Sequence, residues 1–200
     1  MKYHELTSAV KGPVFSRNDL IFSGHKVFDY QLSLWVKKGY LIQLKRGIYA
    51  FSRDKDKIKG EAIAFLLYQP SYLSLESALA WYGFIPEIVH AFTSVTARTT
   101  RSFENSCGRF IYRHVKAELF GGYVEMKTED HALYLLAEPE KALLDYLYLN
   151  ISHINSQADF ENIRLNEEQM GKTLNKDKFL KYLQVFSMKK MEKWARLCLP

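Results

Sequence analysis

The sequence predicts an α+β fold in two parts, and three observations lead to this prediction. The first 59 residues carry twelve Lys and Arg against five Asp and Glu, a net charge of +7, whereas the rest of the chain has a net charge of −1. The same N-terminal stretch has short helix patterns followed by two β-rich runs. A later block of β-rich runs has helix patterns on both sides, which is typical of an α+β domain with a mostly antiparallel sheet.

Three helices are expected in the N-terminal part. The first covers residues 3–10 and ends before Gly12-Pro13. Ser16, with Asp19 three residues later, predicts the N-cap of a short second helix that ends near Phe22. The third helix is expected over residues 26–38 and stops at Gly39. Its apolar face carries Phe28, Leu32, Trp35 and Val36 at helical spacing.

A β-hairpin follows the third helix. The runs 40–44 and 48–51 enclose the turn Lys45-Arg46-Gly47, so two adjacent cations lie at its tip. Three helices followed by a basic hairpin are the pattern of a winged helix-turn-helix, which we assign to residues 1–52. In that geometry the last helix enters the major groove of DNA and the hairpin lies along the backbone or in the minor groove.

The residues expected to contact DNA are polar or cationic residues near the second and third helices and at the hairpin tip: Arg17, Lys26, Tyr30, Ser33, Lys37, Lys45 and Arg46. Each also has a purely structural explanation. Lys37 suits a helix C-terminus without any partner, Lys45 and Arg46 suit a solvated turn, and Tyr30 suits the edge of a small core. The whole pattern, rather than any single residue, therefore indicates nucleic acid.

Residues 53–59 alternate charges and are expected to form a linker to an α+β domain over residues 60–200. In that domain we expect helices over 58–68 and 74–82, then strands over 89–97, 109–115, 123–127 and 131–136, then a helix over 138–149 that starts with Pro139. The remainder, residues 157–198, is expected to be helical in two or three pieces. Its many apolar side chains are interpreted as core, with a partner-docking surface as the alternative.

A second basic strip lies within the C-terminal domain, between residues 93 and 116. Its cations are Arg98, Arg101, Arg109, Arg113 and Lys116. Arginines among hydroxyl side chains suit phosphate contacts. Outward-facing arginines also keep a sheet soluble, so a role in DNA binding or in antitoxicity and a purely structural role both remain open for this strip.

No catalytic motif is found, and no enzyme activity, metal or cofactor is expected. The histidines have no metal-ligand spacing, and the two cysteines are interpreted as ordinary thiols in a reducing cytoplasm. Glu125 and Lys127 resemble the second half of a metal-dependent nuclease motif, which makes a nuclease the enzymatic alternative. Lys141 and Asp145 are expected to form a solvated ion pair on a helix. No membrane segment is expected.

Four segments in this order resemble the AbiEi-type antitoxins of abortive-infection (type IV) toxin–antitoxin systems. They are residues 41–51 (LIQLKRGIYAF), residues 72–83 (YLSLESALAWYG), the basic strand 93–101, and residues 138–147 (EPEKALLDYL). Together they lie within residues 14–149, and the last fifty residues do not contribute. The hairpin segment alone is shared by many winged-helix proteins.

The resemblance implies a transcriptional repressor that binds inverted repeats in the promoter of its own operon. It also implies an antitoxin that counters a nucleotidyltransferase-like toxin without a stable complex. By position it assigns the DNA contacts to Lys26, Tyr30, Ser33, Lys37, Lys45 and Arg46. Dimerisation on the DNA is left open. The third alternative, besides repressor and nuclease, is a winged-helix module that docks a protein instead of DNA.

Overall fold

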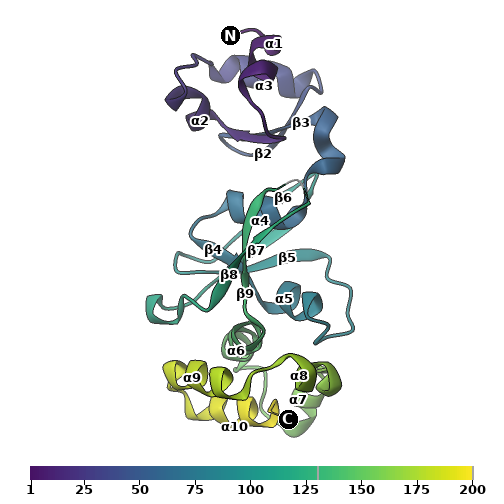
Figure 1. Cartoon of the computed structure of the whole chain (residues 1–200), viewed down its shortest axis with the longest axis vertical. Coiled ribbons are helices and arrows are strands. Elements are labelled where there is room, and N and C mark those ends of the chain that lie inside the picture. The colour runs from purple at the N-terminus through teal and green to yellow at the C-terminus, as the bar shows by residue number, and fades with distance from the viewer. Residues whose placement is uncertain (130, 200) are drawn as a thin grey trace.

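The computed structural model describes residues 1–129 and 131–199, and it is α+β. Figure 1 shows a small N-terminal unit at one end of the molecule, a sheet in the middle and the C-terminal helices at the other end. The buried apolar residues form two clusters: a smaller one within the N-terminal unit and a larger one in the remainder, which also takes in Leu44 and Ala50 of the N-terminal unit. The smaller cluster ends at Phe51, near the expected division of the chain, but the two clusters overlap in sequence.

The N-terminal unit contains three helices and three strands. In chain order they are α1 (Tyr3–Ala9), β1 (Val14–Ser16), α2 (Arg17–Phe22), α3 (Asp29–Lys37), β2 (Leu41–Lys45) and β3 (Ile48–Phe51). The strands form an antiparallel sheet in the order β1-β3-β2. Apolar side chains from all three helices, among them Leu6, Leu20 and Leu32, pack on this sheet and are almost completely buried.

The start of α2 confirms the predicted cap. The Ser16 hydroxyl accepts a hydrogen bond from the Asp19 backbone N–H at 3.0 Å, and the Asp19 carboxylate accepts one from the Ser16 N–H at 3.1 Å. The predicted start of the third helix is wrong by three residues. Phe28 is the N-cap of α3, with an extended backbone, and its N–H donates to the Gln31 side chain at 3.0 Å. Phe28 is consequently exposed rather than part of the core.

Most of the expected charged linker, residues 53–59, forms a short 3₁₀ helix, η1 (Ser52–Lys57). Asp54 explains this, because its carboxylate accepts from Lys57 at 2.8 Å and from Arg53 at 3.3 Å. These local ion pairs lie within one helical turn and lower the pKa of Asp54. The alternating charges therefore favour a compact turn here.

The C-terminal domain has a central sheet and helices on both of its faces. In chain order it contains α4 (Gly60–Leu67), β4 (Ser71–Leu73), α5 (Leu75–Trp81), β5 (Ala91–Thr96), β6 (Arg101–Asn105), β7 (Gly108–His114), the 3₁₀ helix η2 (Ala117–Leu119), β8 (Tyr123–Lys127), β9 (Leu133–Ala137), α6 (Pro139–Asn150), α7 (Gln157–Glu161), α8 (Glu167–Thr173), α9 (Lys176–Phe186) and α10 (Lys189–Leu197).

The six strands lie in the order β6-β7-β5-β4-β9-β8. The pairs β6–β7, β4–β5 and β8–β9 are antiparallel, whereas β5–β7 and β4–β9 are parallel. This sheet is therefore mixed, and the expectation of a mostly antiparallel sheet holds for three of its five strand pairs. Strands β4 and β6 were not expected from the sequence. β4 has only three residues, and β6 is too polar to show a strand pattern.

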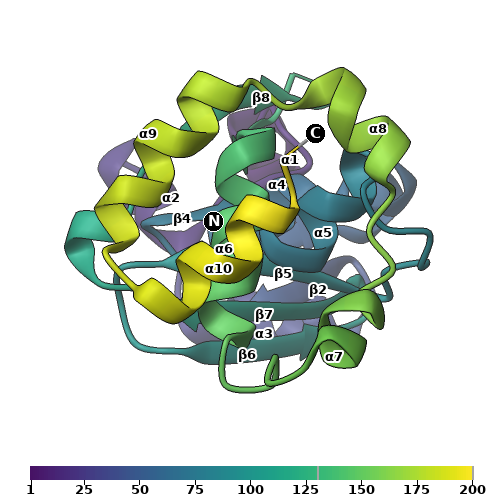
Figure 2. The ribbon, with the colours of Figure 1, turned by 90° about the horizontal axis from the view of Figure 1, so that it is seen from below.

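Helix α4 covers one face of the sheet, and α5 and α6 cover the other. On the α4 face, the Tyr112 hydroxyl donates to the Ala64 carbonyl at 2.5 Å. Figure 2 shows α8, α9 and α10 arranged around α6 at the outer end of the molecule. Lys178 and Tyr182 of α9 donate to the Glu138 carboxylate at the start of α6, and this contact raises the pKa of Tyr182, already raised by burial, to about 12.

The C-terminal segment is helical in four pieces, one more than the largest number expected. Most of its large apolar side chains, including Phe179, Met191 and Trp194, are buried against α6 and its neighbours. The interpretation of these side chains as core is therefore confirmed.

Candidate nucleic-acid interface

The exposed face of α3 carries three of the residues expected to contact DNA. Leu32 and Trp35 anchor the opposite face of the helix in the core. Because an α-helix has 3.6 residues per turn, Tyr30, Ser33 and Lys37 then share the solvent side. All three are exposed, and the Tyr30 side chain is 69% exposed.

Lys26 is near this face but does not lie on the helix as predicted. It belongs to the loop before α3, and its Nζ lies 5.3 Å from the centre of the Phe28 ring. The Phe28 ring in turn stacks on Tyr30 at a centroid distance of 5.8 Å. Lys26, Phe28 and Tyr30 thus form one exposed group at the start of α3, which the sequence pattern had divided between two faces.

A groove of about 770 Å³ separates the start of α2 and α3 from the hairpin. Its lining includes Arg17, Ser33 and Arg46, which were expected, and Asn18 and Gln43, which were not. The Arg17 backbone N–H donates to the Gly47 carbonyl at 2.8 Å, and this bond holds the hairpin turn against α2. Gly47 has a φ of +84°, a conformation that glycine adopts without strain.

Arg17 and Asp29 form an ion pair across this groove, with Nε and Oδ1 2.8 Å apart. Asp29 is the acid within the lining of the groove, and its side chain is 71% exposed. An exposed pair of this kind contributes little to stability. The pair instead determines where the Arg17 guanidinium lies, because Asp29 orients it at the opening of the groove.

Lys45 lies between the hairpin and the C-terminal domain instead of projecting freely from the hairpin tip. Its Nζ donates to the Leu67 carbonyl at 2.7 Å and lies 5.5 Å from the centre of the Phe103 ring. Burial lowers the pKa of Lys45, and the charges of Arg101 and Arg98 lower it further. The prediction of a free cation at this position is therefore corrected, whereas Arg46 beside it is exposed.

The hairpin is attached to the C-terminal domain by further contacts. The Asn105 side-chain amide donates to the Leu44 carbonyl at 3.0 Å, and Leu44 and Ala50 are buried in the larger core. The sequence pattern treated the two parts as joined only by a linker. A hairpin residue that packs away from its own core carries no distinct signal in the sequence, so this contact was missed.

The second basic strip is divided between the two faces of the sheet. Arg98 and Arg101 lie on the α4 face, where their guanidinium carbons are 4.7 and 5.6 Å from the centre of the Tyr68 ring. Arg109 and Arg113 point to the other face, because Phe110 and Tyr112 between them are buried on the α4 face.

The remaining three cations of the second basic strip, Arg109, Arg113 and Lys116, differ in their surroundings. An Arg113 Nη donates to the Leu149 carbonyl at the end of α6 at 3.0 Å, which gives this residue a structural contact. Arg109 is exposed opposite Glu104 in the β6–β7 register. Lys116 is exposed beside Tyr148 and Phe186. The strip is therefore not one continuous surface.

The expected solvated pair Lys141–Asp145 is instead buried in the centre of the C-terminal domain, with side-chain exposures of 5% and 0%. Asp145 accepts hydrogen bonds from Lys141, from the Tyr72 hydroxyl at 2.9 Å and from the Ser74 hydroxyl at 2.9 Å. Lys141 also donates to the Tyr72 oxygen at 2.8 Å. The prediction failed because α6 is covered on several sides, and the Lys–Asp spacing alone does not reveal this.

Burial raises the pKa of the Asp145 carboxyl and lowers that of the Lys141 ammonium, while the charge of each opposes the shift of the other. Burial and the Asp145 charge also raise the pKa of the Tyr72 hydroxyl. All polar groups of this network have partners, so it joins β4, the start of α5 and α6 into one unit.

The residues of the nuclease alternative lie apart from this network. Glu125 and Lys127 are exposed on β8 at the edge of the sheet. In residues 1–129 and 131–199 no group of three or more His, Cys, Asp or Glu side chains is placed to hold a metal ion.

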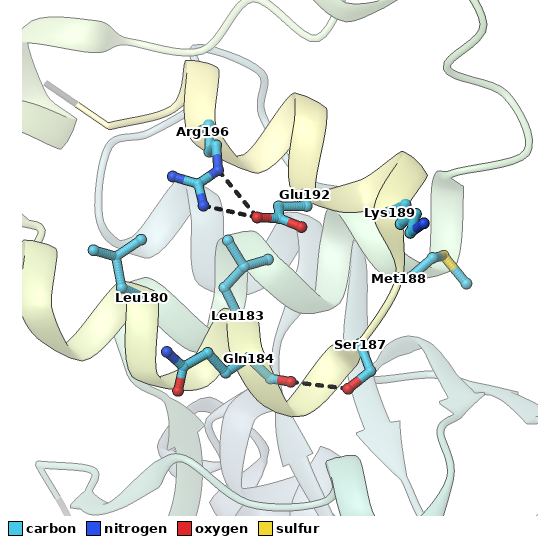
Figure 3. A pocket seen from close by; sticks show the side chains of 8 residues that line it. All are labelled: Leu180, Leu183, Gln184, Ser187, Met188, Lys189, Glu192 and Arg196. Atoms are coloured by element: carbon cyan, nitrogen blue, oxygen red, sulfur yellow. Dashed lines mark hydrogen bonds and ion pairs between the residues drawn. The ribbon is translucent and has the colours of Figure 1, made fainter.

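A second groove, of about 410 Å³, lies between α9 and α10. Figure 3 shows Leu180 and Leu183 on one side and the Glu192–Arg196 ion pair, with Nη and Oε1 2.7 Å apart, on the other. Its lining mixes apolar and charged groups of both signs.

Comparisons with known proteins give no assignment, since neither a family model nor a curated protein matches this chain. Among the described residues, none of the helices combines the length and apolar character needed to cross a bilayer.

Proposed function

We propose that this protein is a DNA-binding repressor of its own operon and that its N-terminal unit binds DNA as a winged helix-turn-helix. The observation that carries the proposal is the order α1-β1-α2-α3-β2-β3 with strand order β1-β3-β2. This order is typical of winged helices, and it brings the exposed face of α3 and the hairpin turn to one groove. The third helix would then read the major groove.

The charges support DNA as the ligand. Arg17 and Arg46 line the groove, Lys37 lies on α3 and Lys26 in the loop before it. The N-terminal 59 residues have a net charge of +7. Such an excess attracts phosphates at long range and fixes the position of a protein on a duplex. Tyr30, Ser33, Asn18 and Gln43 provide groups that hydrogen-bond to base edges or phosphates.

The antitoxin role is proposed on the sequence resemblance to AbiEi-type proteins. In this proposal the protein acts in the cytoplasm, binds inverted repeats in its own promoter and counters a nucleotidyltransferase-like toxin without a stable complex. The proposal includes no catalytic step, metal or cofactor.

One observation favours the second candidate, a winged-helix module that docks a protein. The Phe22 side chain at the end of α2 is 87% exposed, and Ile21 of the same helix and Leu34 of α3 are also exposed. Exposed large apolar side chains on a small unit favour a contact with another protein surface. A second copy bound to the same operator is one such surface.

We expect binding to duplex DNA from upstream of the gene to weaken steeply with salt. Each phosphate neutralised contributes about −0.9 to the slope of log K against log salt, so Arg17, Lys26, Lys37 and Arg46 together predict a slope of about −3.6. Fluorescence anisotropy of a labelled duplex at several salt concentrations measures it. Absence of DNA binding, with salt-insensitive capture of a protein partner, would instead support the docking module.

A further inference from the structure

Strand β8 carries Glu125 and Lys127, for which the proposed function gives no role. It lies at one margin of the central sheet, paired with β9, whereas the strand at the other margin, β6, lies against the hairpin of the N-terminal unit. Figure 2 shows β8 and β6 at opposite margins of the sheet. We propose that β8 pairs with β8 of a second copy of this chain, antiparallel and about a two-fold axis, so that the central sheet continues from one copy into the other.

The backbone of β8 has free hydrogen-bonding groups on its outer side. Just beyond the strand, the Thr128 N–H donates to the Ala132 carbonyl at 2.9 Å, in the register of the β8–β9 pair. Hydrogen-bonded pairs alternate along an antiparallel ladder, so the even-numbered residues of β8 bond to β9. The N–H and C=O groups of Tyr123, Glu125 and Lys127 therefore point outward. Within residues 1–129 and 131–199, these groups form no backbone hydrogen bond outside the ladder.

The side chains of β8 leave this edge accessible. All of them are exposed except that of Met126, which is half-buried. Two of the exposed side chains, Tyr123 and Val124, are apolar, and Leu133, opposite Lys127 on β9, is exposed as well. A free strand edge is a template for pairing with another chain, and exposed apolar side chains beside it favour a protein as the partner.

The charges of β8 select one register for two antiparallel copies. With Met126 opposite Met126 of the second copy, Glu125 of each copy faces Lys127 of the other in a pair bonded by the outward groups. Opposite charges at such positions stabilise a sheet, whereas a register centred on Glu125 would place like charges opposite each other. Within residues 1–129 and 131–199, neither Glu125 nor Lys127 has an oppositely charged group within 4.0 Å, so both are available for this contact.

A two-fold arrangement uses the same surface on both copies, so every contact occurs twice and the assembly closes at a dimer. The strand has five residues, and a contact of this length is smaller than a standard stable interface. We therefore expect a dimer that dissociates on dilution. The association does not depend on the proposed function, but it would give the protein two N-terminal units about a two-fold axis, the symmetry of an inverted repeat.

Sedimentation equilibrium of the full chain at increasing concentrations tests the association, and we expect the average mass to rise from monomer to dimer. Glu125→Lys should weaken the dimer about tenfold or more, because like charges then face each other twice. Exchanging the charges in Glu125→Lys/Lys127→Glu should restore an affinity within a few-fold of the wild type. The control Glu104→Lys makes the same change in charge at an exposed position of β6 and should leave the dimer unchanged.

A proline at position 125 tests the backbone contact. Glu125→Pro removes an outward-pointing N–H and no donor of the β8–β9 ladder, and edge strands tolerate proline at such positions. We expect this variant to be folded, as thermal unfolding checks, and monomeric at concentrations where the wild type is a dimer.

Cysteine substitution tests the register. Met126→Cys places two thiols opposite each other in a non-hydrogen-bonded pair, with Cα atoms about 4.5 Å apart, a distance that a disulfide spans. Val124→Cys places its two Cα atoms roughly 13 Å apart. Under oxidation we expect a crosslinked dimer of Met126→Cys, and none of Val124→Cys or of the wild type with its native Cys107 and Cys198.

Three results would overturn this inference: a wild-type chain that stays monomeric at every concentration, a dimer that Glu125→Pro does not weaken, or equal crosslinking of the two cysteine variants. Each of them leaves the proposed function in place. Conversely, a dimer with the expected responses that does not bind the upstream duplex would contradict the proposed function alone.

Discussion

Replacing Lys141 by methionine is expected to lower the free energy of unfolding by about 3–5 kcal/mol, the largest effect on stability that we predict. The ammonium group of Lys141 lies between the Asp145 carboxylate and the Tyr72 hydroxyl, and its side chain is 5% exposed. Without it, the completely buried Asp145 keeps only the hydrogen bonds from Tyr72 and Ser74. Urea unfolding followed by circular dichroism measures the loss.

The matched control is Lys172→Met, because Lys172 and Glu168 form an i,i+4 pair on α8 whose side chains are 65% and 80% exposed. Such a surface pair contributes about 1 kcal/mol or less. The double variant Lys141→Met/Asp145→Asn should recover a large part of the loss, since no uncompensated charge remains. An equal decrease in the free energy of unfolding for Lys141→Met and Lys172→Met would show that burial does not make the Lys141–Asp145 pair more stabilising than a surface pair.

Charge reversal at Lys37 and Arg46 is expected to weaken binding to the upstream duplex by about 100-fold or more. The two residues lie on the exposed face of α3 and at the hairpin turn, and neither is in an ion pair within the described parts of the chain. A hydrogen bond to a charged group contributes about 1.5–3 kcal/mol, and two such contacts account for this loss. Anisotropy titration of Lys37→Glu/Arg46→Glu measures it.

The control Lys176→Glu/Lys181→Glu makes the same change in net charge on α9, at the other end of the molecule. Both of its lysines are exposed, and we expect an affinity within a few-fold of the wild type. Unchanged binding by Lys37→Glu/Arg46→Glu would exclude this face of the N-terminal unit from the contact with DNA.

Local patterns in the sequence predicted much of the N-terminal unit. The Ser16 cap, the three helices and the hairpin are encoded by neighbouring residues and by helical spacing, so they could be found without tertiary information. The start of α3 was misplaced because Phe28 fits the apolar spacing and yet serves as the N-cap. Strand β1 was missed because three residues give no alternation, and only its pairing with β3 defines it.

Features that depend on contacts between distant segments could not be predicted in the same way. Lys45 appeared as one of two equivalent cations in a turn, but packing against Leu67 and Phe103 separates it from Arg46. The spacing of Lys141 and Asp145 is that of a surface pair, and only the helices around α6 bury it. The second basic strip likewise lies on both faces of the central sheet. Arg98 and Arg101 lie on the face of Tyr68, whereas the alternation along β7 places Arg109 and Arg113 on the opposite face.

Footprinting of the promoter region tests most directly the central claim that the N-terminal unit binds operator DNA. The wild-type chain should protect an inverted repeat upstream of its own gene, with protection in each half-site, at concentrations that leave the flanking DNA unprotected. Lys37→Glu/Arg46→Glu should remove this protection. Uniform protection along the whole fragment, or no protection by folded protein at any concentration tested, would contradict the claim.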